Sequence, residues 1–517
     1  MGFLEDRDLS NVPTIPEFYK GKTILITGGS GFMGKVLIEK LLYSCSELDR
    51  IYLLMRTKKG VKSEDRLTEL YNSPWCFDRL KKEMPDIFMS KVSVVAGDVM
   101  EIGLGLSAED RAMLINKVNI IFHVAASVRF DDPLSLAVKL NLRGTREIVE
   151  LAKEVKDLKV LAHVSTSYSN TNRNPVEEVM YPPHADWRQT LEVAETMDEH
   201  TLRTLTPKYL GEIPNTYTFT KQLAEHVVYE QRGRLPIVII RPSIVISSLS
   251  EPLPGWIENF NGPVGILVAC GKGIMRSIYT DPDLVSDYIP VDIAIKNFIA
   301  ASWLRGTKKL EPTDDIEIYN CCAGDLNHIK MGELVDIGKR LAVAYPLNDM
   351  LWNVGGDLTT SKTIHYIKVI LFHLLPAIFV DAVLWLLGKK PMLIKVQRRI
   401  YIANLALQYY ITQQWSFTNT NFVALRECIK KEDKDKFYYD VEGVDVYEYF
   451  KKSVEGGRRY LLKEKDEDLP KARAHYARVV ILDKLTKCIF YGYLFWWILN
   501  SHWFQSCLLS LKETFVF

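Results

Sequence analysis

The sequence predicts an α/β fold in which a doubly wound parallel sheet occupies the first ~300 residues and a mainly helical, membrane-associated domain follows. Three observations predict it. Short apolar runs rich in β-branched residues alternate with amphipathic helical patterns, an order that produces parallel strands joined by right-handed crossovers. A glycine-rich turn joins the first run to the first helical pattern. In the last third, long apolar segments replace the alternation.

The composition is that of a large globular protein. The chain has 517 residues, of which 47% are hydrophobic and 25% are charged, so a single small domain and extended disorder are both excluded. The 65 basic residues balance 64 acidic ones and leave a formal net charge of +1. The overall charge therefore offers no footprint for nucleic acid.

The first predicted unit is a strand, a turn and a helix. Residues 22–27 are a β-branched apolar run, residues 28–34 are rich in glycine, and residues 35–42 repeat apolar side chains at helical spacing. In such a turn the first glycine permits the bend, the second lets the backbone approach a pyrophosphate, and the third lets the helix pack closely on the strand. We therefore predict a dinucleotide site formed by Gly28, Ser30, Gly31, Phe32, Met33 and Gly34.

The ends of the next two apolar runs predict how the adenosine half of the dinucleotide is bound. Residues 50–55 are followed by Arg56, where an NAD-preferring site usually has an acidic residue and a 2′-phosphate needs a cation. Arg56 therefore predicts NADPH, against the alternative of a solvated basic loop. Residues 92–97 lead to Asp98 and Val99. The Asp98 carboxylate could accept a hydrogen bond from the adenine amino group, and a simple turn aspartate fits the pattern nearly as well.

The following runs bring small and hydroxyl side chains to the same edge of the predicted sheet. Residues 120–124 lead into Ala125 and Ala126, which are small enough to let the backbone line a cofactor, and residues 141–145 then open a helix. Residues 159–164 lead into Ser165 and Thr166. These hydroxyl groups lie at the carboxyl end of a strand, the edge at which parallel sheets of this kind bind ligands.

Tyr217 and Lys221 are the catalytic candidates. Their spacing places a phenol and an ammonium on one face of a helix, about one turn apart. A nearby ammonium favours the phenolate and lowers the tyrosine pKa, so we expect Tyr217 to donate a proton near neutral pH. A YxxxK pair is common by chance. An upstream Ser/Thr strand end and an N-terminal glycine turn, in this order, make it more specific.

With these motifs the chain resembles the extended short-chain dehydrogenase/reductase superfamily and, more narrowly, the alcohol-forming fatty acyl-CoA reductases of animals and plants. The resemblance covers nearly the whole chain, including a C-terminal third of the male-sterility type, and a generic nucleotide-sugar enzyme has no reason to carry its motif at residues 251–265. The motifs are TGGSGFMGKVLIEKLL (27–42), NIIFHVAASVRF (119–130), HVSTSYSN (163–170), NTYTFTKQLAE (215–225), IIRPSIV (239–245) and EPLPGWIENFNGPVG (251–265).

The resemblance implies a Rossmann reductase that uses NADPH twice, first to reduce a long-chain acyl-CoA to the aldehyde and then to reduce the aldehyde to the primary alcohol. Tyr217 would supply the proton donor, Thr166 would orient the carbonyl oxygen with Ser165 as the fallback, and Lys221 would hold the nicotinamide ribose. It also implies that Arg241 and Pro242 lie at the cofactor, and it involves no metal.

A covalent thioester route would instead need an activated cysteine. The eight cysteines form no CxxC pair and no cluster with metal-ligand spacing, so neither a disulfide framework nor a zinc site is predicted. Cys270, Cys321 and Cys322 have no neighbouring histidine in sequence, although Lys272 is close to Cys270. We interpret them as buried small hydrophobic residues. The isolated histidines are interpreted as structural: His123, His163 and His184.

Two apolar segments predict that the C-terminal part meets a membrane. Residues 369–387 contain Pro376 and are apolar except for His373 and Asp381; because charge is costly inside lipid, we predict a membrane-surface or substrate-tunnel helix pair, with a buried core helix as the alternative. Residues 488–511 are uncharged and rich in Tyr and Trp, which predicts an anchor. More basic residues precede this anchor than follow it, so we expect the catalytic domain to be cytosolic, whether the anchor spans once or returns as a hairpin.

The predicted partners are a long-chain acyl-CoA, the fatty aldehyde intermediate and a lipid bilayer, with no nucleic acid and no metal, and an oligomer is possible. The resemblance places the protein at the peroxisomal or endoplasmic reticulum membrane and its product in wax, ether-lipid or cuticular lipid synthesis. Two alternatives are a reductase of the same superfamily that acts on a hydroxysteroid or nucleotide sugar, and a catalytically silent NADPH-binding membrane scaffold. The predicted organisation is an N-terminal arm (1–20), an NADPH-binding Rossmann reductase domain (21–300), the remainder of the substrate-binding region (301–365), a male-sterility-type domain (366–465) and a basic segment with the membrane anchor (466–517).

Overall fold

A computed structural model describes residues 9–56, 63–260, 263–501 and 506, without the side chains of residues 63, 64 and 263. Close contacts divide the chain into two units, which we describe separately. Unit 1 comprises residues 1–262, 280–333 and 404–462. Unit 2 comprises residues 263–279, 334–403 and 463–517.

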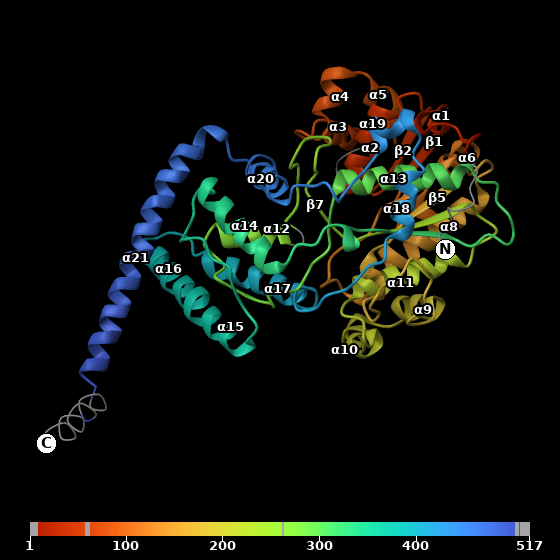
Figure 1. Ribbon diagram of the computed structural model, residues 1–517. Coiled ribbons are helices and arrows are strands. Elements are labelled where there is room, and N and C mark those ends of the chain that lie inside the picture. The colour runs from red at the N-terminus through yellow and green to blue at the C-terminus, as the bar shows by residue number, and fades with distance from the viewer. Residues whose placement is uncertain (1–8, 57–62, 261–262, 502–505, 507–517) are drawn as a thin grey trace. The chain divides into compact units, whose positions relative to one another are not determined.

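Unit 1 is built on a seven-stranded sheet with the order β10-β6-β5-β4-β1-β2-β3 (Figure 1). All neighbouring strands are parallel, and the strand order changes direction between β1 and β4, the switch point at which such sheets bind ligands. The predicted doubly wound parallel sheet is confirmed. Its strands are β1 (Thr23–Thr27), β2 (Arg50–Met55), β3 (Val92–Ala96), β4 (Ile120–His123), β5 (Val160–Val164), β6 (Ile237–Pro242) and β10 (Glu317–Cys321).

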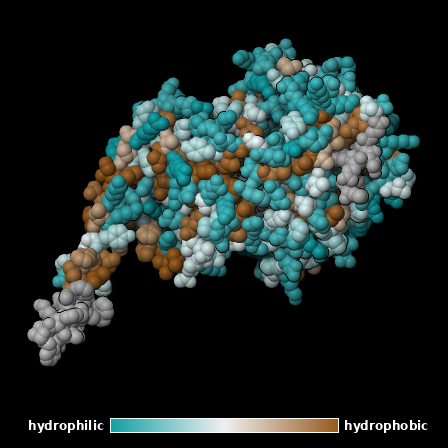
Figure 2. Space-filling model, in the orientation of Figure 1, coloured by the Kyte–Doolittle hydropathy of each residue, from teal (hydrophilic) through white to brown (hydrophobic). Residues whose placement is uncertain are grey.

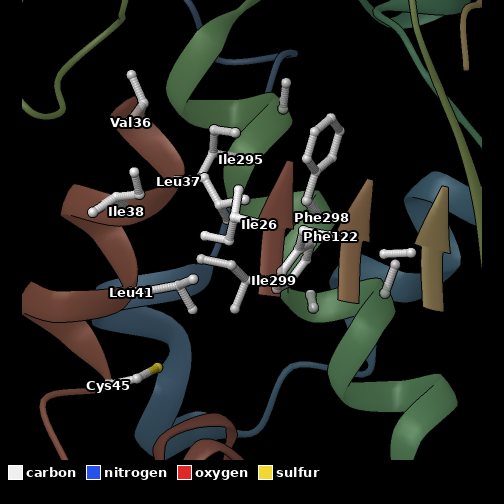
Figure 3. Packing of buried hydrophobic residues seen from close by; sticks show 14 of the residues in the cluster. Ile26, Val36, Leu37, Ile38, Leu41, Cys45, Phe122, Ile295, Phe298 and Ile299 are labelled. Carbon is white, nitrogen blue, oxygen red and sulfur yellow. The ribbon is translucent and has the colours of Figure 1, made fainter. Parts of the chain in front are cut away.

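Each face of the sheet is covered by helices. Successive residues of β1 point to opposite faces, so Ile24 and Ile26 belong to one hydrophobic core and Leu25 to the other. Figure 3 shows the first core, in which Ile26 and Phe122 of the sheet pack among side chains of α2 and α13. The first layer contains α1 (Ile15–Tyr19), α2 (Phe32–Ser44), α3 (Ser63–Tyr71), α4 (Asp78–Glu83), α5 (Ile87–Lys91), α13 (Val291–Thr307), α18 (Thr420–Glu427) and α19 (Lys434–Phe437); the second contains α6 (Ala108–Lys117), α7 (Leu134–Ala137), α8 (Gly144–Glu154), α9 (Trp187–Thr196), α10 (Glu199–Leu210) and α11 (Thr216–Tyr229).

The helix expected to open at residues 141–145 begins earlier than predicted. It starts at Leu134 with α7, passes through a π-helical turn at Val138–Arg143, and continues as α8. Pro133 precedes the first turn, a position that proline favours because the first amides of a helix have no partner inside it. Asn141 and Thr145 therefore lie within a helix, and both are buried.

Unit 2 is mainly helical and carries one small parallel pair of strands. The strands β8 and β11 pair in register from Ser277 with Asp357 to Tyr279 with Thr359. Unit 1 has a similar short pair, β7 (Ile244–Ile246) with β9 (Tyr288–Pro290), and also contains α20 (Val446–Gly456). Unit 2 contains α12 (Pro263–Gly271), α15 (Lys362–Val369), α16 (Leu375–Leu386) and α21 (Leu469–Leu499), and most of α14 (Met331–Ala344) and α17 (Leu393–Ile411).

The apolar segment expected to form a helix pair is one helix. Residues 362–386 run from α15 through a π-helical turn at Ile370–Leu374 into α16, and Pro376 stands at the start of α16. A π turn accommodates a proline, since it re-spaces the backbone where the proline cannot donate a hydrogen bond. Among the described residues this is the helix long and apolar enough to cross a membrane, by length and composition alone.

Unit 2 exposes many large apolar side chains. Figure 2 shows hydrophobic residues on the part of the surface formed by α16 and α21. Phe379 and Trp385 are each 69% exposed, and a run of exposed aromatic and aliphatic residues follows Ile489 in α21. The predicted anchor, residues 488–511, lies partly outside the described residues, which include its first part as far as residue 501 and residue 506.

Candidate active site

The glycine-rich turn lies between β1 and α2, and its backbone leaves little room for side chains. Gly28 has φ +74°, and a Cβ there would lie 2.7 Å from the amide nitrogen of Ala125. A Cβ at Gly34 would lie 2.3 Å from the carbonyl oxygen of Gly28. These two glycines are therefore required by the turn itself, as the sequence predicted for the bend and for the close packing of helix on strand.

The N-terminus of α2 has the form of an anion site. Its N-cap is Gly31, which has no side chain to accept from the first amides of the helix, and Ser30 and Gly31 are exposed. A Cβ at Gly31 would meet only the Gly28 carbonyl oxygen, at 3.2 Å. The free amides, the helix dipole and the missing side chain together fit the pyrophosphate of a dinucleotide.

Phe32 and Met33 are the first two residues of α2, and their side chains pack beside the glycine turn. The Phe32 ring stacks on Trp256 with a centroid distance of 5.1 Å, and Met33 packs partly buried against the first core. Their backbone amides belong to the first turn of α2. Their side chains thus fix the helix end, and a contact of their amides with a cofactor stays a prediction.

Arg56, Asp98 and Val99 lie together beyond the carboxyl ends of β2 and β3. The Arg56 Nε is 4.0 Å from an Asp98 carboxylate oxygen, and the Arg56 side chain is 66% exposed. Asp98 also accepts a hydrogen bond from the Met100 amide at 3.0 Å, an Asx turn that fixes its carboxylate. Val99 lies against Gly144, whose Cβ would be 3.1 Å from the Val99 carbonyl oxygen. An exposed guanidinium beside a hydrogen-bonded carboxylate fits a ribose phosphate next to an adenine.

Ala125 and Ala126 follow β4 at the switch point. The Ala125 amide donates to the Thr27 hydroxyl at 3.2 Å, and Thr27 is 2.8 Å from Nδ1 of His123. His123 Nε2 is 3.0 Å from the Thr145 hydroxyl. Since Thr145 donates its own proton to the Asn141 carbonyl, His123 must donate through Nε2 and accept at Nδ1.

Asn141 is a site residue that the sequence motifs did not identify. Its Oδ1 accepts from the Ser127 amide at 2.8 Å, and its Nδ2 donates to the Ser127 carbonyl at 3.2 Å and to the Thr220 hydroxyl at 3.0 Å. It therefore joins the loop after β4 to the helix that carries Tyr217 and Lys221. The sequence did offer one signal for Asn141, which is its position in the helix that follows β4 at the ligand-binding edge of the sheet.

Tyr217 and Thr166 meet at the carboxyl ends of the strands. The Thr166 hydroxyl lies close enough to the Tyr217 phenol to lower the pKa of that phenol, and it accepts from the Tyr168 amide at 3.2 Å. Ser165, the fallback candidate, is buried, and its hydroxyl has no partner within the described part of the chain. Of the two hydroxyl residues, Thr166 is the one that the fold places at the phenol.

Burial has the largest effect on the pKa of the Tyr217 phenol. It raises the pKa of Tyr217 to about 12, and the hydrogen bond with Thr166 offsets part of that rise. The expectation that a lysine lowers the pKa of Tyr217 below its usual value is therefore wrong. The phenol is therefore protonated near neutral pH.

Lys221 is buried one turn after Tyr217. Its ammonium donates to the Val164 carbonyl oxygen at 2.6 Å, instead of to the phenol. Burial lowers the pKa of Lys221 to about 8, and the nearby Glu225 carboxylate raises it. Lys221 is therefore mostly protonated at pH 7, and the Val164 carbonyl holds its ammonium at the end of β5.

Glu225 was also missed by the motif analysis. It lies one turn beyond Lys221 on α11 and forms a buried ion pair with Arg241, with N–O distances of 2.7 and 2.9 Å. The Ser169 hydroxyl donates to it as well. Removing one partner of such a buried pair typically costs about 3–5 kcal/mol of stability. Its spacing of four residues from Lys221 was the signal available in the sequence.

The guanidinium of Arg241, a predicted cofactor residue, is held by protein contacts. Besides Glu225, its guanidinium donates to the carbonyl oxygens of Glu177 and Val179, and the side chain is fully buried. Pro242, at the end of β6, presents its carbonyl oxygen to the Thr166 hydroxyl at 3.4 Å. Both residues therefore support the strand end from behind.

The isolated cysteines and histidines have no geometry for covalent catalysis. Burial raises the pKa of the Cys270 thiol to about 12 and holds the thiol pKa values of Cys321 and Cys322 well above the usual range. Burial lowers the pKa of His123 to about 3 and that of His163 far below the usual value. His184 is half-buried, and its pKa is lowered for the same reason. Within the described residues there is no group of three or more His, Cys, Asp or Glu that could hold a metal ion.

The sequence is similar to family models and to known proteins. A family model described as male sterility protein matches residues 26–298, and a second model with the same description matches residues 372–464. The chain is 39% identical to fatty acyl-CoA reductase 1 of Xenopus laevis over 466 residues, which are 89% of each chain. It is 36% identical to fatty acyl-CoA reductase wat of Drosophila melanogaster over 489 residues, which are 95% of this chain and 93% of that protein.

Solved structures support the fold. The terminal R domain of the myxalamid PKS-NRPS biosynthetic pathway aligns with a TM-score of 0.57 at 18% identity, covering 86% of this chain and 93% of that one. The reductase domain of a non-ribosomal peptide synthetase from Mycobacterium tuberculosis aligns with a TM-score of 0.57 at 20% identity, covering 86% of this chain and 92% of that one.

Proposed function

This chain belongs to the fatty acyl-CoA reductase family of male sterility proteins, and on that premise we propose that it reduces a long-chain acyl-CoA to the primary alcohol through the aldehyde and releases CoA. The observation that supports the proposal best is the meeting of Tyr217, Thr166 and Lys221 at the strand ends beside an open glycine turn. A protonated phenol in that position is the donor that a developing oxyanion needs.

NADPH is the proposed reductant, and it would supply a hydride to the carbonyl carbon in each reduction. The amides around Gly31 would hold its pyrophosphate, and Asp98 would face the adenine. Arg56 gives the preference for the 2′-phosphate, because a guanidinium matches a phosphate with directed hydrogen bonds. The proposed cofactor residues are Gly28, Ser30, Gly31, Phe32, Met33, Gly34, Arg56, Asp98, Val99, Ala125, Ala126, Tyr217 and Lys221, and Arg241 and Pro242 act indirectly.

In the first reduction, Tyr217 and Thr166 would hydrogen bond to the thioester oxygen as it gains negative charge. When the carbonyl re-forms, the C–S bond breaks and its electron pair leaves with the CoA thiolate. This step needs no enzyme nucleophile, which agrees with the raised thiol pKa values of the buried cysteines.

In the second reduction, Tyr217 would transfer its proton to the aldehyde oxygen as the carbon accepts hydride, and the product is the primary alcohol. The phenolate is then reprotonated from solvent. Lys221, whose ammonium donates to the Val164 carbonyl, would hold the nicotinamide ribose and stabilise the transient phenolate by its charge.

Purified full-length chain in detergent tests this function. With a long-chain acyl-CoA we expect two NADPH oxidised and one free thiol released per alcohol formed, and a higher kcat/KM with NADPH than with NADH. A panel with sterols and nucleotide sugars serves as the control. Turnover of the panel without turnover of acyl-CoA contradicts the proposal, and so does an absence of any turnover.

We also propose that unit 2 attaches the protein to a bilayer, at the peroxisomal or endoplasmic reticulum membrane with the catalytic unit in the cytosol. The polar residues of the apolar helix 362–386 are already satisfied: Asp381 accepts from the amides at the start of α17, three bonds of 2.9 Å, and His373 accepts from the Arg276 amide at 2.8 Å. These bonds hold one side of the helix against unit 2. Its other side, which includes Phe379, and the exposed Trp385 near the end of the helix are free to enter the interface of one leaflet.

Site-specific labelling measures this attachment. In a background with serine at positions 488 and 507, Phe379→Cys carrying a polarity-sensitive fluorophore should be strongly quenched by spin-labelled lipid in nanodiscs, because the side chain lies in acyl chains. The matched control is Met89→Cys on α5, an apolar residue that is 50% exposed. Equal quenching at the two positions would contradict the proposed membrane face.

A further inference from the structure

Tyr410, in the last turn of α17, reaches the start of the catalytic helix from the C-terminal part of the chain. It belongs to unit 1 and to the segment matched by the second family model, almost 200 residues after Tyr217. Its side chain is 8% exposed. The Tyr410 hydroxyl accepts a hydrogen bond from Nδ2 of Asn215 at 2.7 Å.

Asn215 is the N-cap of α11. Its Oδ1 accepts from the Thr218 amide at 3.0 Å and from the Thr218 hydroxyl at 3.2 Å. Tyr217 is the second residue of this helix, inside the turn that the cap closes. The direction in which the Asn215 amide points therefore fixes where the phenol of Tyr217 lies.

The Thr218 amide can only donate, so it requires the oxygen end of Asn215, and the Tyr410 hydroxyl anchors the amide in that orientation by pairing with the other end. An asparagine amide can be turned end for end, and it caps a helix only with its oxygen toward the helix amides. Tyr410 accepts from the nitrogen end and so keeps the oxygen end on Thr218. Without this acceptor, the nitrogen of a side chain that is only 7% exposed would lose its partner, at a cost comparable to a lost hydrogen bond.

Ring contacts join the same residues. The Phe130 ring is 5.9 Å from the Tyr217 ring and 5.0 Å from the Tyr410 ring, and the Tyr168 ring meets Tyr410 edge-on at 5.3 Å. Tyr168 follows Thr166 by two residues. Tyr410 therefore contacts the surroundings of both the phenol and the hydroxyl of the proposed reaction.

The segment that follows Tyr410 is tied to the loop after β5. The Trp415 indole donates to the Thr171 carbonyl at 2.9 Å, the Val176 amide donates to Ser416 at 2.8 Å, and the Thr418 amide donates to Val176 at 3.0 Å. These bonds fix Tyr410 relative to the strand end that carries Thr166.

We propose that Tyr410 is a positioning residue for the reduction. It holds the Asn215 cap, and through the cap it holds Tyr217 against Thr166. The inference rests on the proposed function for its activity readout. It means that residues of the C-terminal family segment complete the active site that the Rossmann sheet begins.

A double-mutant cycle on the full-length protein tests this role. Tyr410→Phe should lower kcat about tenfold, because the Tyr217 phenol is misplaced. The KM values for acyl-CoA and NADPH should stay within about twofold of wild type, because both ligands still bind. Serine is also a good N-cap and has no amide nitrogen to satisfy. In an Asn215→Ser background, Tyr410→Phe should therefore change kcat by less than about twofold.

Tyr409→Phe is the matched control, because Tyr409 contacts the rings of Tyr410 and Trp415 and should leave kcat within about twofold of wild type. The same tenfold loss in both backgrounds would overturn the proposal. So would a Tyr410→Phe variant whose KM values, NADPH affinity and melting temperature all change together, since that pattern marks a role limited to folding.

Hydrogen exchange gives a readout that needs no turnover. Tyr410→Phe should speed exchange in a peptide covering residues 215–219, where the Thr218 amide is bonded to the cap, and should have no such effect in the Asn215→Ser background. If wild type reduces no acyl-CoA, the proposed function fails while this measurement still tests the coupling. Unchanged exchange in Tyr410→Phe would overturn it.

Discussion

Tyr217→Phe is expected to lower kcat for acyl-CoA reduction by about 10²- to 10⁴-fold, the range associated with a positioned proton donor. The substitution removes the hydroxyl that Thr166 contacts and keeps the ring, which packs near Phe130 at 5.9 Å. The helix and its Asn215 cap do not depend on this hydroxyl. The loss should therefore appear in the chemical step, and the affinity for NADPH should change little.

Stopped-flow reduction and NADPH titration of the same preparations separate these two quantities. Tyr229→Phe is the matched control, because Tyr229 ends the same helix and lies more than three turns from Tyr217. It should retain wild-type kcat. A Tyr217→Phe enzyme with wild-type turnover would exclude Tyr217 as the proton donor, and a loss of NADPH binding as large as the loss of kcat would show that the hydroxyl acts mainly in holding the cofactor.

The parts of the site that the sequence predicted are those in which chemistry and spacing are local. Tyr217 and Lys221 share one helix face, and the glycine turn is a continuous segment, so their geometry follows from secondary structure alone. The sheet was predictable for the same reason, since alternating strands and helices have few ways to pack. The place of Ser165 and Thr166 followed because strand ends in a parallel sheet share an edge, and the family resemblance selected Thr166 of the two.

Contacts between distant segments were not predictable. The Trp415 indole bonds to the carbonyl of Thr171, 244 residues away, and no local pattern reports that pairing. The ion pair between Arg241 and the buried Glu225 illustrates the same limit, because the motif around Arg241 does not name that partner. The pKa of Tyr217 was predicted in the wrong direction, because burial depends on the whole fold and outweighs the charge of one neighbour.

The apolar helix 362–386 shows how tertiary hydrogen bonds change the meaning of a sequence. Asp381 in an apolar run was costly for a membrane span and suggested a surface or tunnel helix. The structure places its carboxylate at the N-terminus of α17, where three amides need an acceptor. The residue that looked unfavourable in the sequence thus links two helices of unit 2.

Gly31→Ser is expected to weaken NADPH binding by about 5- to 150-fold without lowering the melting temperature of the free protein. Forcing extra atoms into a close-packed contact costs about 1–3 kcal/mol, which corresponds to that range of Kd. Gly31 has φ −82°, which serine adopts freely, and its Cβ would meet only the Gly28 carbonyl oxygen, at 3.2 Å. Serine is in addition a preferred N-cap, so the free protein gains a cap bond.

That cap bond is the reason why stability and affinity should move in opposite directions. A serine hydroxyl would accept from the amides at the start of α2, which are the donors proposed for the pyrophosphate, and its bulk would stand where the cofactor backbone approaches. Gly34→Ala is the contrasting variant, since its Cβ would lie 2.3 Å from the Gly28 carbonyl oxygen and should lower the melting temperature and the affinity together. Calorimetric titration with NADPH and thermal unfolding of both variants measure the two effects. A Gly31→Ser protein that binds NADPH as tightly as wild type would show that the pyrophosphate does not lie at this helix end.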